Sequence, residues 1–352
     1  MRIIVKRHTG PLGASGALAA AIAIGMASAG AEAGDAKYTK VVVSGAAQTY
    51  PYGINDAGAV AGYYLDNAGN YHGFLRAHDG DITTFDAPGA GTYTDAIGIN
   101  NKGTITGNFI DGSGINHGYI RSAAGTFVTV DPPGSIDTTV LAINIRGAVA
   151  GTYADASNEP HGFTRDASGA ITSFDPSGSR QTVAESINAS GVITGFYYDA
   201  NEAAHGFVRT PDGTITSFDA PNSFMYTRPT SVNDKNYIAG NYQDENANVQ
   251  AFELAPGGAF TEFEAPNATD TYAVGINDRG EIAGNFEIND IDAKYVFVRA
   301  PDGAISTYSP PQGGTLPQSF VTAVNKEGEV VGMTHDGSHI KRSKETGFIL
   351  KP

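Results

Sequence analysis

The stretch from Gly53 to Gly62 recurs along the chain with a nearly fixed period. Its Ile-Asn or Val-Asn pair returns every 44 to 48 residues, and an internal repeat of this length constrains the fold more than any local feature does. The apolar members of the pairs are Ile54, Ile99, Ile143, Ile187, Val232, Ile276 and Val324. The sequence therefore contains seven copies of one structural unit.

Each copy has the pattern of four short strands. In the first copy, an apolar run ends at Asn55, a turn with Gly58 follows, and further runs cover 59–66, 72–76 and 82–86. Alternation rich in Ile, Val, Thr, Phe and Tyr, interrupted every 8 to 12 residues by Gly, Asn, Asp or Pro, is typical of strands joined by hairpins. We expect each copy to form a four-stranded antiparallel meander.

Stacked copies of this kind predict an all-β fold, a seven-bladed β-propeller, because one meander cannot bury both of its faces. The seventh copy stops one strand short at Phe348–Leu350, and a loose copy of the missing strand lies at Tyr38–Val43. We expect this N-terminal strand to complete the last blade and close the ring, which would hide two sheet edges.

Residues 1–33 are predicted to be a signal peptide and short linker outside the fold. A basic start with Arg2, Lys6 and Arg7 precedes an Ala/Gly-rich apolar segment, and small residues offer cleavage near 29 or 33. Residues 34–352 then form one propeller domain, secreted or periplasmic, with no integral membrane segment after cleavage. The chain has no Cys, so its stability outside the cell would come from packing.

The chain carries a net charge of −15, and loss of the three basic residues near its start would make it −18. This acidity argues against nucleic acid as a partner. We expect a monomer whose partner is an unknown protein or glycan.

The positions shared by the copies predict packing and turns. A small residue precedes each anchor, as Gly53 does, and would lie where innermost strands crowd around an axis. The Gly in each second strand, such as Gly62, indicates close approach by a backbone or a ring, and Phe74 and its equivalents could fill that space. The anchor Asn would cap its own turn, although a ring of seven Asn at a pore is an alternative ligand site.

Four copies share a His, and its position favours a structural role. His72, with its equivalents, would hydrogen-bond a neighbouring blade, since equivalent third-strand positions are too spread round a ring to share a metal. Asp86 and its equivalents would cap turns and pair with arginines such as Arg76. The four histidines are His72, His117, His161 and His205.

The segments Asn70–Phe74, Asn116–Tyr119 and Gln250–Phe252, each preceded by a Gly-Ile-Asn-Asp-like turn, resemble the HAF repeats of extracellular bacterial proteins. The resemblance covers residues 38–352. It implies an exported propeller-like protein and brings no catalytic residues with it.

Two neighbouring hairpins depart from the repeat, and a specific site is expected where copies differ. The hairpin at 287–292 is acidic and one residue longer than the standard, and the hairpin at 335–344 is basic and four residues longer. They could form a surface ion-pair patch. The sharper hypothesis is a ligand site whose residues include arginines and a tyrosine from inter-blade loops: His335, His339, Lys341, Arg342, Asp290, Arg228, Arg180 and Tyr226. Unpaired arginines there would suit a carboxylate or sulfate.

No cofactor is expected, with calcium as the alternative. The second hairpins of three copies begin with Asp66, Asp111 and Asp199 and offer clustered oxygens, but they lack the alternating acidic run of a strong calcium site. The sequence contains no nucleophile, phosphate-loop or zinc-protease motif.

These patterns favour an exported, non-catalytic binding or interaction module for a protein, a polysaccharide or the cell envelope. The alternative is a propeller-fold polysaccharide lyase or hydrolase with its site at the mouth of the pore. The absence of Trp weakens a sugar-binding role, although 17 Tyr could replace it as stacking surfaces.

Overall fold

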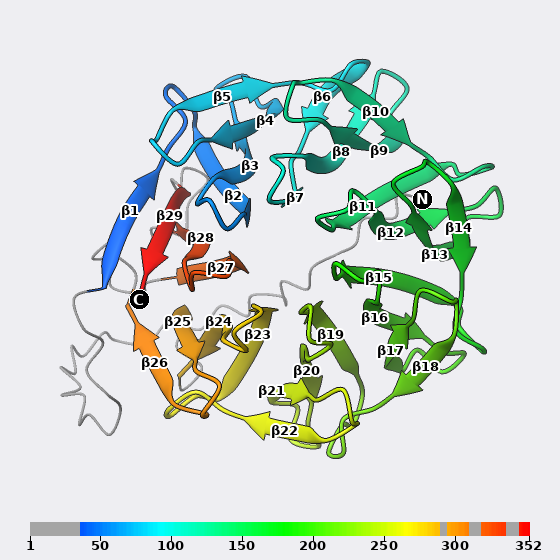
Figure 1. The fold of residues 1–352 in the computed structure, drawn as a ribbon, viewed down its shortest axis with the longest axis vertical. Helices are drawn as coiled ribbons and strands as arrows, with labels where there is room; N and C mark the ends of the chain where they lie inside the picture. The colour runs from blue at the N-terminus through cyan, green and yellow to red at the C-terminus, as the bar shows by residue number, and fades with distance from the viewer. Residues whose placement is uncertain (1–35, 289–293, 310–317, 336–344) are drawn as a thin grey trace, which may run out of the picture.

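A computed structural model describes residues 36–288, 294–309, 318–335 and 345–352. Throughout these ranges the regular elements are β-strands. Figure 1 shows the sheets arranged side by side in a ring, with the chain running around it from β1 to β29. In the described part of the chain, no helix long and apolar enough to cross a membrane occurs.

The strands of each sequence copy pair antiparallel, and we call them a blade and number it by its copy. Copies three, four and five form separate four-stranded sheets, whereas parallel pairs join copy one to copy two and copy six to copy seven in larger sheets. The first strands lie nearest the centre of the ring (Figure 1). They are β2 (Gln48–Ile54), β6 (Ala90–Thr94) with β7 (Gly98–Ile99), β11 (Asp137–Ile143), β15 (Gln181–Ile187), β19 (Thr227–Val232), β23 (Asp270–Ile276) and β27 (Gln318–Val324).

The second and third strands form the middle of each blade. The second strands are β3 (Val60–Leu65), β8 (Ile105–Asp111), β12 (Val149–Ala154), β16 (Ile193–Tyr198), β20 (Ile238–Gln243), β24 (Ile282–Glu287) and β28 (Val330–His335). The third strands are β4 (Tyr71–Arg76), β9 (Asn116–Arg121), β13 (Pro160–Arg165), β17 (Ala204–Arg209), β21 (Val249–Leu254), β25 (Lys294–Arg299) and β29 (Thr346–Lys351).

The outermost strands complete the blades. In copies one to six they are β5 (Ile82–Phe85), β10 (Phe127–Val130), β14 (Ile171–Phe174), β18 (Ile215–Phe218), β22 (Phe260–Phe263) and β26 (Ile305–Tyr308). In the seventh copy this place belongs to β1 (Lys37–Val41), which pairs antiparallel with β29. The N-terminal strand therefore lies where the sequence predicted it.

The core lies between blades and is built from one aromatic residue of each third strand. Phe74 is fully buried and packs with Val331 and Ile349 of the seventh blade. Its ring lies across Gly62 of its own blade, where an added Cβ would be 2.8 Å from the ring and 2.2 Å from the Tyr50 carbonyl oxygen. Only Gly fits at this position, because any side chain would clash with both the Tyr50 backbone and the Phe74 ring. The equivalent buried rings are Tyr119, Phe163, Phe207, Phe252, Phe297 and Phe348.

Innermost strands crowd against one another, as the small residues predicted. A Cβ added at Gly53 would lie 3.0 Å from the carbonyl oxygen of Ile97 and 3.2 Å from the amide nitrogen of Ile99, both in the second blade. A register shift between Pro51 and Gly53 marks a bulge at this point of β2, and equivalent shifts occur in β11, β15, β19, β23 and β27.

Arginines at the ends of third strands stack on the preceding blade. The Arg121 guanidinium lies 4.6 Å from the centre of the Phe85 ring, Arg209 lies 4.9 Å from Phe174, and Arg299 lies 4.8 Å from Phe263. Such contacts combine cation–π attraction with burial of the aliphatic stem. They make these arginines part of the inter-blade packing.

Candidate ligand-binding face

The antiparallel connections give the ring two distinct faces. Each first strand runs toward the anchor Asn hairpin, and each second strand returns to the opposite side. In copies one to five, the second hairpin and the loop to the next blade both lie on that side. We call the side with the Asn hairpins the turn face. The side with the second hairpins and the inter-blade loops is called the loop face.

On the turn face, the anchor Asn residues link each blade to the next. The Oδ1 atom of Asn144 accepts from the amide nitrogens of Arg146 and Ala148, both at 3.0 Å, so it caps its own turn. Its Nδ2 donates to the backbone oxygen of Asn188 in the next copy at 2.9 Å. The same inter-copy bond is made by Asn55, Asn100, Asn188, Asn233, Asn277 and Asn325.

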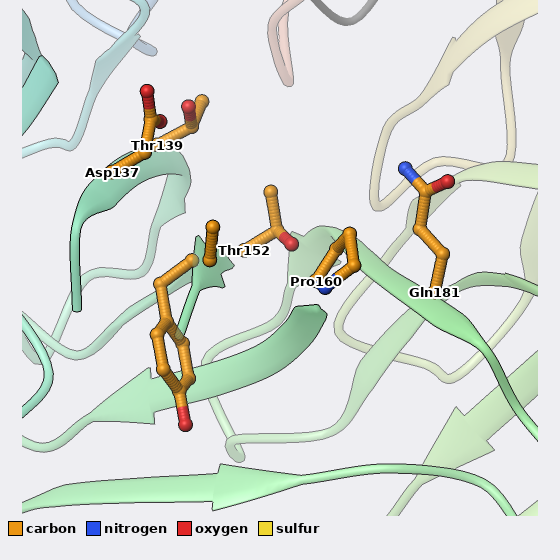
Figure 2. Close-up of a pocket in the computed structure, with 7 residues that line it drawn as sticks. Asp137, Thr139, Thr152, Pro160 and Gln181 are labelled. Atoms are coloured by element: carbon orange, nitrogen blue, oxygen red, sulfur yellow. The ribbon is translucent and has the colours of Figure 1, made fainter. Parts of the chain in front are cut away.

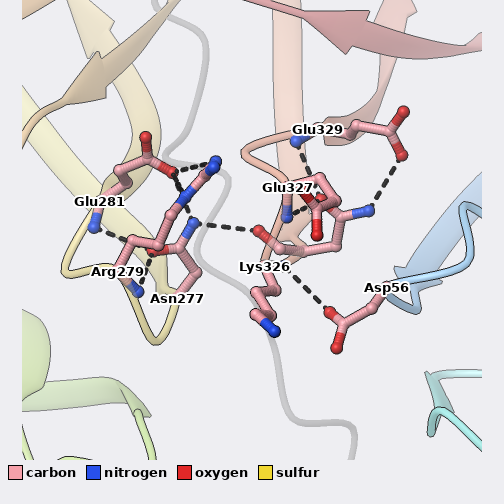
Figure 3. A network of polar contacts seen from close by, with 8 residues as sticks. Asp56, Asn277, Arg279, Glu281, Lys326, Glu327 and Glu329 are labelled. Carbon is pink, nitrogen blue, oxygen red and sulfur yellow. Dashed lines mark hydrogen bonds and ion pairs between the residues drawn. The ribbon is translucent and has the colours of Figure 1, made fainter.

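These Asn side chains are buried and their polar atoms are engaged within the protein. Figure 3 shows the links that join the sixth, seventh and first copies, where Asn277 bonds to the seventh copy and the amide of Lys326 donates to Asp56. The Asn ring is therefore a structural connection between blades. The hypothesis of a ligand site formed by this ring has no support in its geometry.

The repeated histidines bridge two carboxylates of their own blade. His72 Nδ1 lies 2.8 Å from Asp86 Oδ1, and its Nε2 lies 3.4 Å from Asp66 Oδ2. The expected bond to a neighbouring blade was wrong, because the hairpin at Asp66 and the end of β5 bring both carboxylates to the same His. The partners of the other histidines are Asp111 and Asp131 for His117, Asp155 and Asp175 for His161, and Asp199 and Asp219 for His205. Asp86 and its equivalents therefore pair with histidines and not with arginines.

The carboxylates considered for calcium serve as turn caps. Asp66 Oδ1 accepts from the amides of Ala68 and Asn70, each at 2.8 Å, and Oδ2 faces His72. The backbone N–H of Asn70 is the main cause that lowers the pKa of Asp66 to about 2. Asp111 and Asp199 make the same pair of backbone bonds. Within the described ranges, no group of three or more His, Cys, Asp or Glu could hold a metal ion.

One position of the first strand differs in every neighbouring copy. It lies between a buried Thr or Ser, such as Thr49, and a small apolar residue, such as Pro51, in the half of the strand nearer the loop face. The residues at this variable position are Tyr50, Asp95, Thr139, Val183, Arg228, Tyr272 and Phe320. A constant scaffold therefore carries different side chains at this position, of which Asp95 and Val183 are buried and the other five are half-buried.

The residue after each packing Gly also varies, and it decides how two blades are joined. In copies two, five and six it is an Asn whose amide bonds the next first strand, as Asn241 does with the nitrogen of Ala273 at 2.6 Å and its oxygen at 3.0 Å. In the first and fourth copies it is Tyr63 and Phe196. At these two junctions aromatic clusters replace the amide link.

The cluster between the first and second blades contains five tyrosines. The Tyr63 ring stacks on Tyr50 and Tyr52, with centres 4.7 and 5.6 Å apart, and lies 5.9 Å from Tyr71 and 6.5 Å from Tyr93. The Tyr93 hydroxyl donates to Asp95 at 3.1 Å. Burial raises the pKa of Tyr63 and Tyr93 well above the ordinary range, so both hydroxyls stay protonated.

The cluster between the fourth and fifth blades surrounds Arg228. Its guanidinium lies 4.9 Å from the centre of the Phe196 ring and 4.8 Å from that of Tyr226. Its Nη2 donates to the hydroxyl of Tyr198, whose backbone oxygen accepts from the amide of Arg180 at 2.8 Å. The structure thus brings Arg228 and Tyr226 together, with the backbone of Arg180 beside them.

His335 lies in the seventh blade, apart from the Arg228 cluster. It ends β28 opposite Gln318, and its electrostatic partner is Glu345 at the start of the next strand. The Tyr50 hydroxyl donates to Oε1 of Gln48 and also interacts with the Glu345 carboxyl group. The backbone oxygen of Glu345 accepts from the amide of Thr49 at 3.1 Å. Burial raises the pKa of Glu345. The predicted residues His339, Lys341, Arg342 and Asp290 lie outside the described residues.

A shallow pocket opens on the loop face between the third and fourth blades (Figure 2). Its volume is about 10 Å³, on the order of one water molecule. Asp137 and Gln181 lie on opposite sides of it in Figure 2, with Thr152 and Pro160 between them. Sequence comparison of the copies did not single out this pocket, although its lining residues Thr139 and Thr152 stand at the two positions that vary between copies.

The fold is similar to those of solved β-propeller proteins. A streptogramin B lyase matches with a TM-score of 0.57 and 15% identity over 90% of this chain and 98% of the other. A catalytically inactive virginiamycin B lyase from Staphylococcus aureus matches with a TM-score of 0.59 and 14% identity over 90% and 100%. A puromycin hydrolase matches with a TM-score of 0.56 and 13% identity over 82% of this chain and 50% of the other.

These similarities confirm the predicted all-β, propeller-like fold. Neither a protein-family model nor a curated protein sequence matches the chain. The HAF-repeat family therefore stays a resemblance.

Proposed function

We propose that this chain is an exported, ring-closed, seven-bladed β-propeller that binds a protein, a polysaccharide or the cell envelope through its loop face, without catalysis. The observation that carries the proposal is the variable position of the first strand. Seven copies keep the residues that pack and turn, yet they place Tyr, Asp, Thr, Val, Arg, Tyr and Phe in turn at this one position. Packing alone would favour one repeated residue there, whereas recognition of an asymmetric ligand needs different ones.

Three contacts support closure of the ring. β1 pairs with β29, Thr322 of the seventh copy donates to the Pro51 oxygen at 3.0 Å, and Asn325 donates to Asn55 at 3.0 Å. The proposed domain covers residues 34–352, acts as a monomer and works in the periplasm or outside the cell. It needs no cofactor in this proposal.

A thermal-shift screen tests the binding function. The protein purified after export would be heated with soluble polysaccharides, peptidoglycan fragments and organic acids, because a ligand that binds only the folded state raises the melting temperature. Tyr50→Thr, Arg228→Thr and Tyr272→Thr variants would follow each hit, since Thr139 holds the same place in the third copy. A shift that persists unchanged in all three variants and after shortening of residues 335–344 would place the ligand elsewhere and contradict the proposal.

The second candidate is a polysaccharide lyase or hydrolase, favoured by the arrangement of Glu345, Tyr50 and His335. A carboxyl group with a raised pKa beside a hydroxyl and an imidazole is suited to proton transfer. Incubation with a polysaccharide panel would reveal unsaturated chain ends for a lyase and new reducing ends for a hydrolase. Activity that is lost in Glu345→Gln, with ligand binding retained, would favour this candidate over the first.

A further inference from the structure

We infer that Arg228 is the receptor for the carboxylate group of a small organic acid, bound on the loop face between the fourth and fifth blades. This inference rests on the proposed function and names a ligand class for it. Four features of the described residues support it: the rigid position of the guanidinium, its missing counter-ion, the exposed apolar side chains beside it and the acidity of the whole chain.

The guanidinium is held by aromatic groups from two blades. Phe196 belongs to the fourth blade and Tyr226 to the loop that enters the fifth, and their ring centres lie 4.9 and 4.8 Å from the guanidinium carbon. The hydroxyl of Tyr198 fixes the rotation of the plane by accepting from Nη2. A planar cation that is fixed before binding loses little conformational entropy when it forms two parallel hydrogen bonds to a carboxylate.

The charge of Arg228 has no counter-ion among the described residues. By contrast, Arg299 lies 2.8 Å from Glu253 and Arg279 lies 2.9 Å from Glu281. The Nε atom of Arg228 is buried without a hydrogen-bond partner, as are those of Arg121 and Arg209, which also have no ion pair among the described residues but lie at the turn-face ends of their strands. The negative charge of Asp270 contributes to the raised pKa of Tyr226, after burial as the main cause. The Asp270 carboxylate accepts a hydrogen bond from the amide of Val249 at 2.6 Å. The guanidinium is therefore fixed without a carboxylate partner among the described residues, and an external anion would bind through its Nη atoms, because Nε is buried.

Exposed apolar side chains lie in the loop that carries Tyr226 into the fifth blade. Phe224 and Met225 are 70% and 55% exposed, and they directly precede Tyr226. Their backbone is anchored, since the Phe224 amide donates to the Gln243 oxygen at 2.8 Å and the Met225 oxygen accepts from the Ala204 amide at 3.3 Å. From Asp219 to Thr227 this loop is one residue longer than the equivalent loop from Asp175 to Thr182. We expect the exposed side chains of Phe224 and Met225 in this longer loop to contact the apolar body of a ligand.

The net charge of −15 selects among anionic ligands. A polyanion such as a densely sulfated polysaccharide would be repelled by the rest of the surface, whereas a single carboxylate is repelled less and can pair with Arg228. The two oxygens of a carboxylate also match the planar fork of a guanidinium. The ligand class is therefore a monocarboxylate with an apolar or ring-shaped body.

Isothermal titration calorimetry on the protein purified after export tests this inference with matched pairs of probes. The pairs are phenylacetate with phenylacetamide, and galacturonate with galactose. We expect at least one acid to bind about tenfold or more tightly than its neutral twin, because a charge-assisted pair of hydrogen bonds distinguishes them. Arg228→Met should abolish this preference and Arg228→Lys should keep part of it.

Arg209→Met is the control, since Arg209 also stacks on a Phe ring but lies at the turn-face end of its strand. It should leave the preference unchanged. Equal binding of acid and neutral twin in both pairs, or undiminished preference in Arg228→Met, overturns the inference. If Arg228→Met does not fold, Phe224→Ala provides the test, because its exposed side chain can be removed without unfolding and phenylacetate should bind it several-fold more weakly. A ligand that binds the loop face with the same affinity in the Arg228→Met variant would refute this inference but would still support the proposed function.

Discussion

The side-chain Nδ2 of Asn325 donates a hydrogen bond to the backbone oxygen of Asn55 at 3.0 Å, although 270 positions separate the two residues. Each earlier anchor Asn makes the same bond to the next copy, so this contact joins the last copy to the first in the same way. In the proposed ring, stability at the junction of first and last blades should therefore resemble stability at every other junction.

Removal of one anchor Asn should weaken the link between two blades. Asn144→Ala removes two turn-capping bonds and one bond to Asn188, and we expect a loss of about 2 to 3 kcal/mol in the free energy of unfolding. Urea denaturation followed by Tyr fluorescence measures it. Asn201→Ala, on an exposed hairpin, is the control and should change stability by less than about 0.5 kcal/mol. Equal effects of the two substitutions would contradict the linking role.

The N-terminal strand should contribute to stability through one face only. Val41 is 0% exposed and packs with Val331 and Ile349, whereas its neighbour Val42 is 43% exposed. Val41→Ala should cost about 2 kcal/mol through lost burial and a residual cavity, and Val42→Ala should cost almost nothing. Comparable denaturation midpoints for the two variants would show that β1 does not dock as described.

Gly195 should tolerate no side chain. A Cβ there would lie 2.0 Å from the Val183 oxygen and 3.0 Å from the Glu185 nitrogen, so Gly195→Ala forces two backbones apart. We expect a loss of more than about 3 kcal/mol or failure to accumulate folded protein. Gly257→Ala is the matched control, since no atom lies within 4 Å of its added Cβ. A stable Gly195→Ala protein would refute the packing explanation for the repeated Gly.

Stability should depend on pH through the His–Asp pairs. Burial lowers the pKa of His72, but its hydrogen bonds to Asp86 and Asp66 outweigh burial and raise the pKa overall, and the pKa of His117 and His161 is raised in the same way. A raised folded pKa stabilises the protein below the unfolded value of about 6.5, and this contribution is lost as pH rises through the folded pKa. The pKa of Asp66, Asp111 and Asp155 is lowered in the folded protein. These carboxylates therefore stabilise the fold at pH values above the unfolded pKa of about 3.9, and this contribution is lost as the pH falls through the folded pKa.

Thermal melting between pH 2 and 9 checks this dependence, and the expected maximum lies at about pH 4 to 6.5. The triple variant with Gln at positions 72, 117 and 161 should lose the decline above neutral pH and keep the decline in acid. An unchanged alkaline decline in that variant would assign it to other groups.

Sequence comparison predicted the positions that the backbone constrains. Gly62 and Gly53 could be predicted because close contacts exclude every other side chain, and Asn55 because a short acceptor caps a turn. The second role of Asn55, donation to the next blade, could not be predicted, since strand periodicity gives the face on which a side chain lies and not the neighbour that receives it. The same limit explains why His72 was expected to contact another blade.

The candidate site was predicted only in part. Arg228 and Tyr226 were selected from their loop, and they do meet in space. The variable position was missed at Tyr50 and Tyr272, although it lies four residues before the anchor Ile or Val in every copy. Constant residues mark packing and turns, whereas variation at one position does not by itself distinguish a site from free surface. The signal that could have found it is one position that varies between copies while its neighbours, such as Thr49 and Pro51, keep their residue type.

Ligand binding through the loop face is tested most directly by hydroxyl-radical footprinting of the exported protein, with and without a ligand from the thermal-shift screen. Aromatic and Met side chains report on both faces. Bound ligand should reduce oxidation on the loop face, at Phe224, Met225 and Tyr226 or at Tyr50, and should leave Tyr237 on the turn face unchanged. Protection confined to Tyr237 and the turn face, with the loop-face residues oxidised as before, would contradict it.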